Sequence, residues 1–445
     1  MRVLVTGLCS LQWGRMEHGN IGNYYIMVPL FRNLHRVFPG AEIITTLQLT
    51  DEFCEAECVK TMSLESYYGW VESDLDSALK DFASAYAFAS ETVCEGLSEY
   101  LQTVLSSDLV ISFAGDMWGD NSEGMGPNRF LVDLLKTRSA MTMGKTVVLF
   151  ASSPGPVTDS RYLDLARKVF SDFSLVVTRE KNSRRILSEG GFDVSKTVHA
   201  ACPAFLFDSS YYPQIVDVTS LRAAEGFDLS DALNVGFILA TYSLPGSSFD
   251  SWERDDSDFS DYVELIEHMV VEKGQRVVLI SHSNGFILPP NFKRTHWRDY
   301  KMICQLYDIL KSRGIANMDL VHKVDQLYQP WEMHALIGQL DMLVSGRVHG
   351  AVAGLAQCIP TLAVDYKNGP LAHKMFGFFE LAGVEEYVVP RECGNMISAY
   401  NKFNSDSNVT RERLQTTIPL VKQEAINGFD ILADLMDPSN HEGLR

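Results

Sequence analysis

The chain has 445 residues, an apolar fraction of 46% and a formal net charge of −19, with an isoelectric point near 5.0. This length and this apolar fraction suit two globular domains better than a single core. An acidic chain lacks the basic face that a nucleic-acid binder needs, so we exclude that class and expect any anion site to be a local basic pocket.

The N-terminal sequence Met-Arg-Val-Leu-Val-Thr-Gly predicts a strand that begins at once, without the basic region and apolar core of a secretory signal. No apolar run reaches the roughly twenty residues that a spanning helix needs. We therefore expect a cytoplasmic protein without a transmembrane segment, with peripheral contact to a membrane left open.

The first half of the chain alternates apolar strands with helical segments. Strands are predicted at 2–6, 109–113, 146–151, 175–178 and 197–200, and helices at 24–37 and 180–190. The second half repeats this pattern, with strands at 234–240, 276–280, 340–344 and 360–364 and helices at 261–273 and 300–313. Such alternation is typical of parallel sheets covered by helices.

A polar stretch with little periodicity separates the two halves. We therefore predict an α/β protein with an N-terminal domain at 1–210, a linker at 211–232 and a C-terminal domain at 233–405. Helical spacing within 406–445 predicts a tail helix that packs across the domain junction.

The eight cysteines are scattered, and only Cys54 and Cys58 lie close in sequence. A spacing of four suits one helix face better than a metal site, which would need a second pair of ligands nearby. We expect reduced thiols, no metal requirement and no organic cofactor.

One short motif delivers cationic side chains to the end of a strand. Strand 340–344 is followed by Ser345-Gly346-Arg347-Val348-His349-Gly350 and a helix of small residues. Backbone N–H groups and the dipole at a helix start attract anions, and ligands of open α/β sheets lie at the carboxyl ends of strands. The motif predicts a phosphate or carboxylate site, and the alternative is a solvated turn or helix cap.

Four segments together resemble the polysaccharide pyruvyl transferases. They are Gly19-Asn20-Ile21-Gly22-Asn23, the turn at 112–118, Val177-Thr178-Arg179-Glu180 with Pro203-Ala204-Phe205, and the Arg347 motif with Ile359-Pro360 and Asp365-Tyr366. The resemblance implies two Rossmann-like domains that face across a cleft, as in GT-B glycosyltransferases. It also implies phosphoenolpyruvate as the donor, whose pyruvyl group becomes a ketal on two hydroxyls of a sugar. That sugar would belong to a polysaccharide or to its lipid-linked or nucleotide-linked precursor.

The donor's chemistry suits these residue types. Arginine offers a planar fork that both a carboxylate and a phosphate accept, so Arg347 is the first choice and Arg179 the second. Ketal formation moves protons to and from the reacting groups, and imidazole suits both transfers at neutral pH, which favours His349. Further donor-side candidates are Ser345, Gly350, Lys367 and His282, the last because it follows strand 276–280.

The resemblance places the acceptor on the N-terminal domain. Its candidate residues are Asn20, Gly22, Asn23 and Asp116. The alternatives are a tight strand-to-helix connection for the glycine loop and a helix cap for Asp116.

Several positions depart from the family pattern. Asn23 and Cys202 stand where an aspartate is usual, and Ala114 stands where a glycine is usual. No basic residue ends strand 234–240, and Gly369 stands at the position of a usual lysine. Lys367, His373 or Lys374 could supply the missing charge.

These departures keep two other function classes open. A GT-B-type glycosyltransferase would use Arg347 and the helix start to hold the diphosphate of a nucleotide-sugar. A non-catalytic binding module of glycan assembly would keep the fold without the chemistry.

Overall fold

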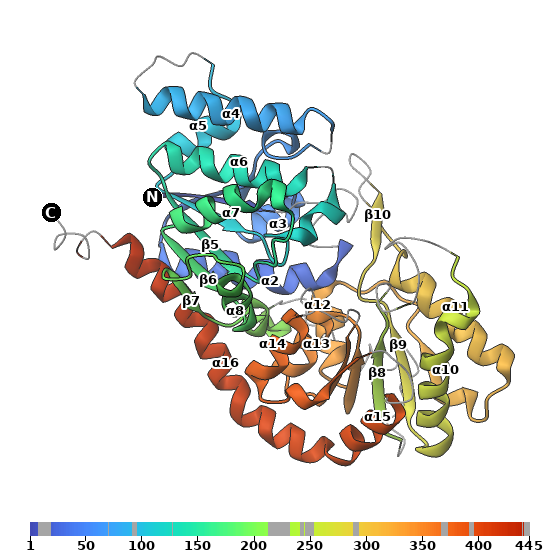
Figure 1. Cartoon of the computed structure of the whole chain (residues 1–445). Coiled ribbons are helices and arrows are strands. Elements are labelled where there is room, and N and C mark those ends of the chain that lie inside the picture. Colours follow the sequence, from blue (N-terminus) through green and yellow to red (C-terminus); the bar gives the residue numbers. More distant parts are fainter. Residues whose placement is uncertain are drawn as a thin grey trace. The chain divides into compact units, whose positions relative to one another are not determined.

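The computed structural model describes residues 1–7, 19–69, 71–90, 96–126, 128–211, 232–240, 244, 253–287, 293–365, 373–390, 396–437 and 439 (Figure 1). The chain forms two compact units. The first unit contains Met1–Met16, Val28–Pro203 and Gln423–Arg445, and the second contains Glu17–Met27 and Ala204–Lys422. None of the described helices is both long enough and apolar enough to cross a bilayer.

The first unit is built on a seven-stranded parallel sheet in the order β3-β2-β1-β4-β5-β6-β7. Its strands are β1 (Arg2–Gly7), β2 (Glu42–Thr45), β3 (Val59–Thr61), β4 (Leu109–Phe113), β5 (Thr146–Ser152), β6 (Leu175–Thr178) and β7 (Thr197–His199). The central strands β1, β4 and β5 are buried almost throughout, which explains their continuous apolar sequences.

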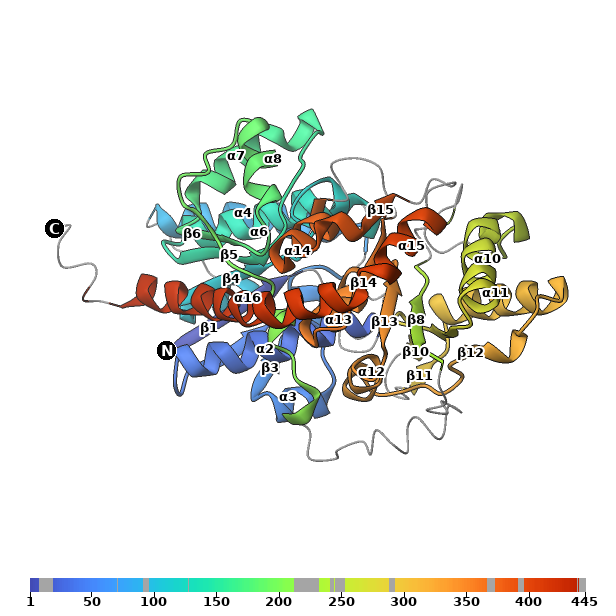
Figure 2. The same cartoon turned by 90° about the horizontal axis from the view of Figure 1, so that it is seen from below.

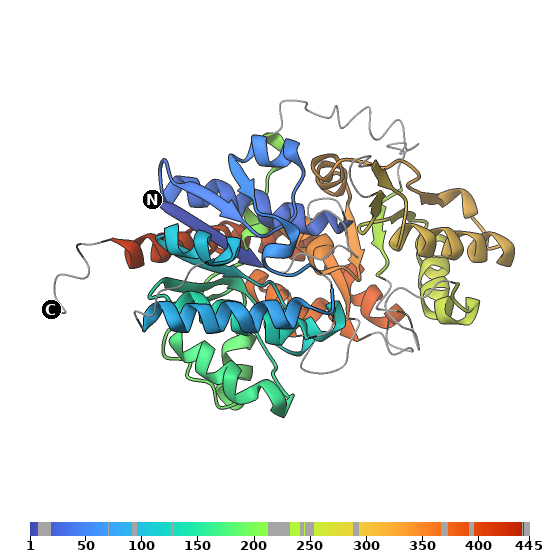
Figure 3. The same cartoon turned by 90° about the horizontal axis from the view of Figure 1, so that it is seen from above.

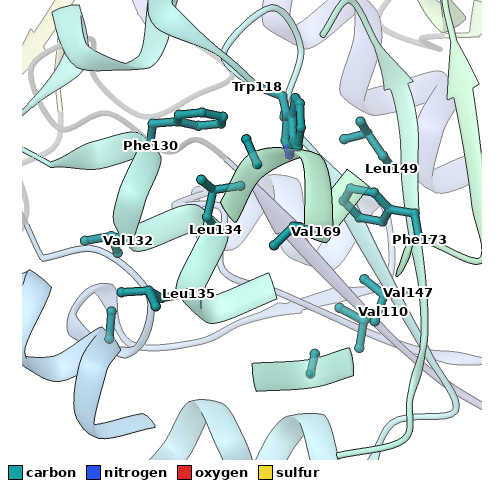
Figure 4. Packing of buried hydrophobic residues seen from close by; sticks show 14 of the residues in the cluster. Val110, Trp118, Phe130, Val132, Leu134, Leu135, Val147, Leu149, Val169 and Phe173 are labelled. Carbon is teal, nitrogen blue, oxygen red and sulfur yellow. The ribbon is translucent and has the colours of Figure 1, made fainter. Parts of the chain in front are cut away.

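Helices cover this sheet. They are α3 (Asp51–Ala56), α4 (Asp74–Ala89), α5 (Glu99–Ser106), α6 (Arg129–Thr142), α7 (Ser160–Asp172) and α8 (Asn182–Glu189). Figures 1 and 3 show α4 lying along α6, which packs in turn on β5. The ring of Trp118 lies in the core of this unit, 5.4 Å from the ring of Phe130 in an edge contact (Figure 4). It also lies 5.3 Å from the ring of Phe170 in a tilted contact.

The second unit has a six-stranded parallel sheet in the order β12-β9-β8-β13-β14-β15. Its strands are β8 (Asn234–Ile238), β9 (Arg276–Ile280), β12 (Val321–Lys323), β13 (Met342–Ser345), β14 (Thr361–Asp365) and β15 (Val388–Pro390). A hairpin of β10 (Gly285–Ile287) and β11 (Lys293–Thr295) forms part of the connection that follows β9. Both sheets therefore have the Rossmann order, in which the chain reverses its direction of winding beside the first strand.

The helices of the second unit are α10 (Ser260–Glu267), α11 (Asp299–Arg313), α12 (Pro330–Ile337), α13 (Val348–Ala356), α14 (His373–Ala382) and α15 (Met396–Ser405). Figures 2 and 3 show α10 and α11 side by side. The Glu332 carboxylate accepts a 2.7 Å hydrogen bond from the Gln329 N–H, which caps α12.

Two helices pass from one unit to the other. Helix α2 (Ile21–Val37) begins in the second unit and ends in the first. Helix α16 (Ser407–Met436) also begins in the second unit and ends in the first. Within the first unit, the ring of Phe429 on α16 lies 4.9 Å from the ring of Phe150.

The predicted α/β class with two Rossmann-like sheets is confirmed. The helix predicted at 261–273 is confirmed, with an α-helical part that ends at Glu267 and a π-helical turn at His268–Glu272. One local prediction was wrong. Cys58 lies beyond the end of α3 with φ +52°, so it does not share a helix face with Cys54. The described cysteines, Cys54, Cys58, Cys202, Cys304 and Cys358, are free thiols. Apart from its two end residues, the predicted linker lies outside the described residues.

Close packing of α13 on the sheet positions the turn that precedes this helix. A Cβ atom at Gly354 would lie 2.6 Å from Thr361 Oγ1 and 2.8 Å from Leu343 Cδ2. Helix α13 can therefore approach β13 and β14 only because residue 354 lacks a side chain.

We expect Gly354→Ala to destabilise the protein despite the higher helix propensity of alanine. Overpacking of this kind costs about 1–3 kcal/mol, whereas the propensity gain is about 1 kcal/mol. Urea unfolding measures the change. The double variant Gly354→Ala with Thr361→Ala should lose less free energy of unfolding than the sum of the losses of the two single variants. Strict additivity of the two losses would contradict the proposed clash.

Candidate active site

The Arg347 motif lies at the point where the second sheet reverses its winding. Ser345, the last residue of β13, pairs with Ile238, the last residue of β8, and the Gly346 N–H donates a 2.8 Å hydrogen bond to the Ile238 carbonyl. Arg347 is the N-cap of α13, and His349 lies in the first turn of that helix. This is the position at which open α/β sheets form their ligand crevice.

The guanidinium of Arg347 is held by the carboxylate of Asp299, at the start of α11. Arg347 Nε donates to Asp299 Oδ2 at 3.0 Å, and Arg347 Nη2 donates to Asp299 Oδ1. Asp299 is fully buried and Arg347 is 3% exposed. The pair is therefore a desolvated, two-pronged ion pair that fixes the plane of the guanidinium and balances its charge.

Asp299 also anchors the loop that follows β9. Its Oδ2 accepts a 2.8 Å hydrogen bond from the Ser283 N–H. The Ser283 hydroxyl donates to the Gly19 carbonyl at 3.1 Å, and the Asn284 N–H donates to the same carbonyl at 2.8 Å. One carboxylate thus links the Arg347 turn to the β9 loop, which in turn holds the segment that opens α2.

The segment Gly19–Asn23 belongs to the second unit, although it follows the first strand of the chain. Asn20 and Ser283 form an isolated antiparallel bridge. A Cβ atom on Gly22 would lie 2.5 Å from His349 Cβ and 3.2 Å from His282 Cε1. Gly22 therefore fits between the two predicted histidines only because it lacks a side chain.

The first N–H groups of α2 already have partners. The Ile21 N–H donates to the His282 carbonyl at 3.3 Å, the Gly22 N–H to Asn20 Oδ1 at 3.1 Å and the Asn23 N–H to the Asn20 carbonyl at 2.8 Å. Asn20 acts as the cap of the helix, so these three donors hold the loop in place.

His282 is buried within a cluster of aromatic rings. Its ring is 5.7 Å from that of Tyr25, which is 5.2 Å from the ring of His334. Burial, followed by the nearby Arg347 charge, lowers the pKa of His282 to about 3, and burial lowers the pKa of His334 to about 3 as well. His282 is therefore neutral at physiological pH, and neither ring nitrogen has a hydrogen-bond partner in the structure.

His349 is half-buried, and its ring lies 6.2 Å from that of Phe378 on α14. His373 and Lys374 open α14, so they belong to the helix that packs beside α13. Gly350 lies in the first turn of α13, where a Cβ atom would lie 2.8 Å from Ile238 Cδ1 and 3.1 Å from Ser345 Oγ. Lys367 lies outside the described residues.

The remaining predicted residues, Asp116 and Arg179, lie at the carboxyl edge of the first sheet. Arg179 is 2% exposed, and its Nε donates to Ser153 Oγ at 2.9 Å. The Ser153 N–H donates to the carbonyl of Gly115, next to Asp116, at 2.6 Å. Ser153 thus connects Arg179 to the residue that precedes Asp116. Among the described residues, no group of three or more His, Cys, Asp and Glu side chains could hold a metal ion.

A family model provides an independent comparison. The model of polysaccharide pyruvyl transferases matches residues 20–368, a span that contains the Arg347 turn, Asp299, His282 and the start of α2. The chain belongs to the polysaccharide pyruvyl transferase family.

Three individual proteins are similar to the chain, one in sequence and two in fold. The amylovoran biosynthesis protein AmsJ of Erwinia amylovora is 22% identical over 353 residues, which cover 78% of this chain and 77% of AmsJ. A glycosyltransferase from Rickettsia africae has a TM-score of 0.59 at 10% identity, with 98% of each chain covered. A UDP-GlcNAc 2-epimerase from Neisseria meningitidis, bound to UDP-GlcNAc, has a TM-score of 0.56 at 13% identity, with 98% of this chain and 99% of that chain covered. The solved structures confirm the GT-B-like fold class.

Three residues of this candidate site were missed from the sequence. Asp299 contacts Arg347 across 48 positions, and no local pattern marks it. Tyr25 and His334 sit in helices where their spacing resembles that of ordinary core residues.

Removal of the Asp299 charge should be costly. We expect Asp299→Asn to lower the free energy of unfolding by about 3–5 kcal/mol, because it leaves the Arg347 charge buried without a counter-charge. Urea unfolding is the measurement. The double variant Asp299→Asn with Arg347→Met removes both charges and should recover part of the loss, whereas a further loss would contradict this view of the pair.

The two buried histidines should make stability depend on pH. Their pKa falls from 6.5 in the unfolded chain to about 3 in the folded chain, so the unfolded chain binds more protons between these values. Stability is complete above about pH 6.5 and falls as the pH drops, by about 2 kcal/mol for each histidine at about pH 5. Urea unfolding at about pH 7 and pH 5 should show a smaller loss for His334→Asn than for the wild type. Equal losses would contradict the assignment.

Proposed function

We propose that this chain transfers the pyruvyl group of phosphoenolpyruvate to a sugar of a polysaccharide or of its precursor and forms a pyruvate ketal. The observation that carries the proposal is Arg347, held in a fixed plane beside His349 at the winding reversal of the second sheet. Membership of the pyruvyl transferase family and the similarity to an amylovoran biosynthesis protein support a transferase of polysaccharide biosynthesis.

The proposed ketal formation conserves the atoms and protons of the donor and the two hydroxyls. Two sugar hydroxyl oxygens form bonds to C2 of phosphoenolpyruvate, and the bond from C2 to the phosphate oxygen breaks. One hydroxyl proton replaces the proton that His349 delivers to the enol methylene, which becomes a methyl group. The second hydroxyl proton leaves with inorganic phosphate. A group that both gives and takes a proton is needed, and imidazole suits that role.

The donor's anionic groups need several contacts. Arg347 provides a guanidinium in a fixed plane, and Ser345 and Gly350 bring the backbone of the same turn close to it. His282 would contribute hydrogen bonds as a neutral ring, since its pKa of about 3 rules out a cation at neutral pH.

Asp299 balances the charge of Arg347, so a ligand as anionic as phosphoenolpyruvate requires further cations. Arg179, Lys367, His373 and Lys374 are the candidates.

The candidate acceptor residues are Asn20, Gly22, Asn23 and Asp116. Asn20, Gly22 and Asn23 lie against the second sheet, next to His349, and Asp116 follows β4 of the first sheet. Our proposal includes no resident metal or organic cofactor, places the protein in the cytoplasm and leaves peripheral membrane contact open.

Calorimetric titration with phosphoenolpyruvate tests the donor without knowledge of the acceptor. We expect the wild type to bind with a dissociation constant in the micromolar to low-millimolar range, which corresponds to a binding free energy of about −4 to −8 kcal/mol. Arg347→Lys keeps a charge beside Asp299 but loses the planar fork, so it should weaken binding about tenfold or more. His349→Asn should bind the donor but fail to turn it over.

A surface arginine serves as the control. Arg313 is half-exposed and pairs with Glu267, so Arg313→Ala should bind phosphoenolpyruvate like the wild type. No heat from the folded wild type would contradict the proposed donor. Binding of UDP-GlcNAc instead would favour a glycosyltransferase, and absence of both would favour a non-catalytic module.

A further inference from the structure

A buried arginine in the first unit has no role in the chemistry described so far. Arg129 opens α6 and is 0% exposed. Its Nη2 donates a 3.1 Å hydrogen bond to the carbonyl of Gly7, the last residue of β1. Gly7 pairs with Phe113, the last residue of β4. The guanidinium therefore lies where the first sheet reverses its winding, at the same position in that sheet that Arg347 occupies in the second.

The other hydrogen-bonding groups of Arg129 are not satisfied. Its Nε and Nη1 are buried, and neither has a hydrogen-bond partner in the structure. The guanidinium lies 4.4 Å from the ring centroid of Tyr68 and 5.5 Å from that of Tyr67. The two aromatic faces offset part of the desolvation cost, but they do not accept hydrogen bonds from the remaining N–H groups, which point along the plane of the guanidinium.

The carboxyl of Asp133, which interacts electrostatically with Arg129, forms no ion pair with it. No described carboxylate lies within ion-pair distance of Arg129, and Asp133 accepts a 2.7 Å hydrogen bond from the Tyr67 hydroxyl instead. Burial raises the pKa of Asp133, which weakens its value as a counter-charge.

Another buried cation of this unit shows the contrast. Lys136, 1% exposed on the same helix, forms an ion pair with Asp81 and donates to the Ser66 carbonyl at 2.9 Å. Its hydrogen-bonding groups are therefore engaged by the protein itself. Arg129 differs by lying at the ligand edge of the sheet with donors left over.

We propose that Arg129 forms an anion site in the first unit and binds a carboxylate or phosphate group carried by a sugar. The planar fork of arginine accepts both groups with two parallel hydrogen bonds, and Nε and Nη1 supply unused donors. If the bound sugar is the acceptor of the transfer, this inference rests on the proposed function, and the acceptor is then an acidic or phosphorylated sugar. The binding of an anion at Arg129 does not itself depend on phosphoenolpyruvate.

Calorimetry with three sugars tests the site. Glucose 1-phosphate carries a phosphate, methyl glucuronide carries a carboxylate, and methyl glucoside is neutral. We expect the wild type to bind at least one anionic sugar more tightly than the neutral one. The sugar that binds more tightly shows whether the site prefers a phosphate or a carboxylate. Arg129→Met should lose about tenfold or more of that affinity, and Arg129→Lys should lose less.

A matched variant controls for the loss of a buried cation. Lys136→Met removes a buried cation from the same helix and should bind the anionic sugar like the wild type. Phosphoenolpyruvate is titrated separately. If only the proposed function fails, the wild type will not bind phosphoenolpyruvate but will still bind the anionic sugar in a way that depends on Arg129. Unchanged affinity in folded Arg129→Met, or equal binding of the neutral sugar, would overturn the site.

A second measurement keeps the proposal testable if Arg129→Met does not fold. The guanidinium is shielded from solvent, so a ligand reaches it only through local opening, which hydrogen exchange detects. In the wild type, the preferred anionic sugar should slow exchange in peptides that contain Gly7, Phe113 and Arg129. No change in these peptides at a saturating concentration of glucose 1-phosphate and of methyl glucuronide would overturn it.

Discussion

The candidate active site depends on the seating of Gly22 between His349 and His282. No larger residue fits, because a Cβ atom would lie 2.5 Å from His349 Cβ. The fit brings the start of α2 onto the β9 loop, where the Gly19 carbonyl accepts hydrogen bonds from Ser283 and Asn284. A segment early in the chain therefore meets His282, Asp299 and His349, which follow more than 250 positions later.

Electrostatics within the site depend on burial. Arg347 and Asp299 neutralise each other in a desolvated pair, and burial keeps His282 neutral. The site is thus preorganised without a large local charge, since a fixed guanidinium plane and a neutral imidazole need little rearrangement when a ligand arrives. The unpaired donors of Arg129 in the first unit show the opposite arrangement, a buried cation without a matching acceptor.

Sequence patterns predicted the central strands well because burial on both faces gives continuous apolar runs. Strands β4, β6 and β9 match their predicted limits. The short strand β2 and the edge strand β3 were not predicted, since β2 has four residues and β3 has three, of which two are exposed polar residues. The Arg347 turn could be predicted from local residues. Its partner Asp299 and the seating of Gly22 could not, because both arise from contacts between distant segments.

Gly22→Ala provides the most direct test of the central claim, that the Gly22 fit holds His349 and His282 in a phosphoenolpyruvate site. Gly124→Ala is the matched control, since a Cβ atom there meets no atom within 4 Å. In calorimetric titration with phosphoenolpyruvate, we expect Gly124→Ala to bind like the wild type and folded Gly22→Ala to lose binding. Wild-type affinity in Gly22→Ala would contradict the account.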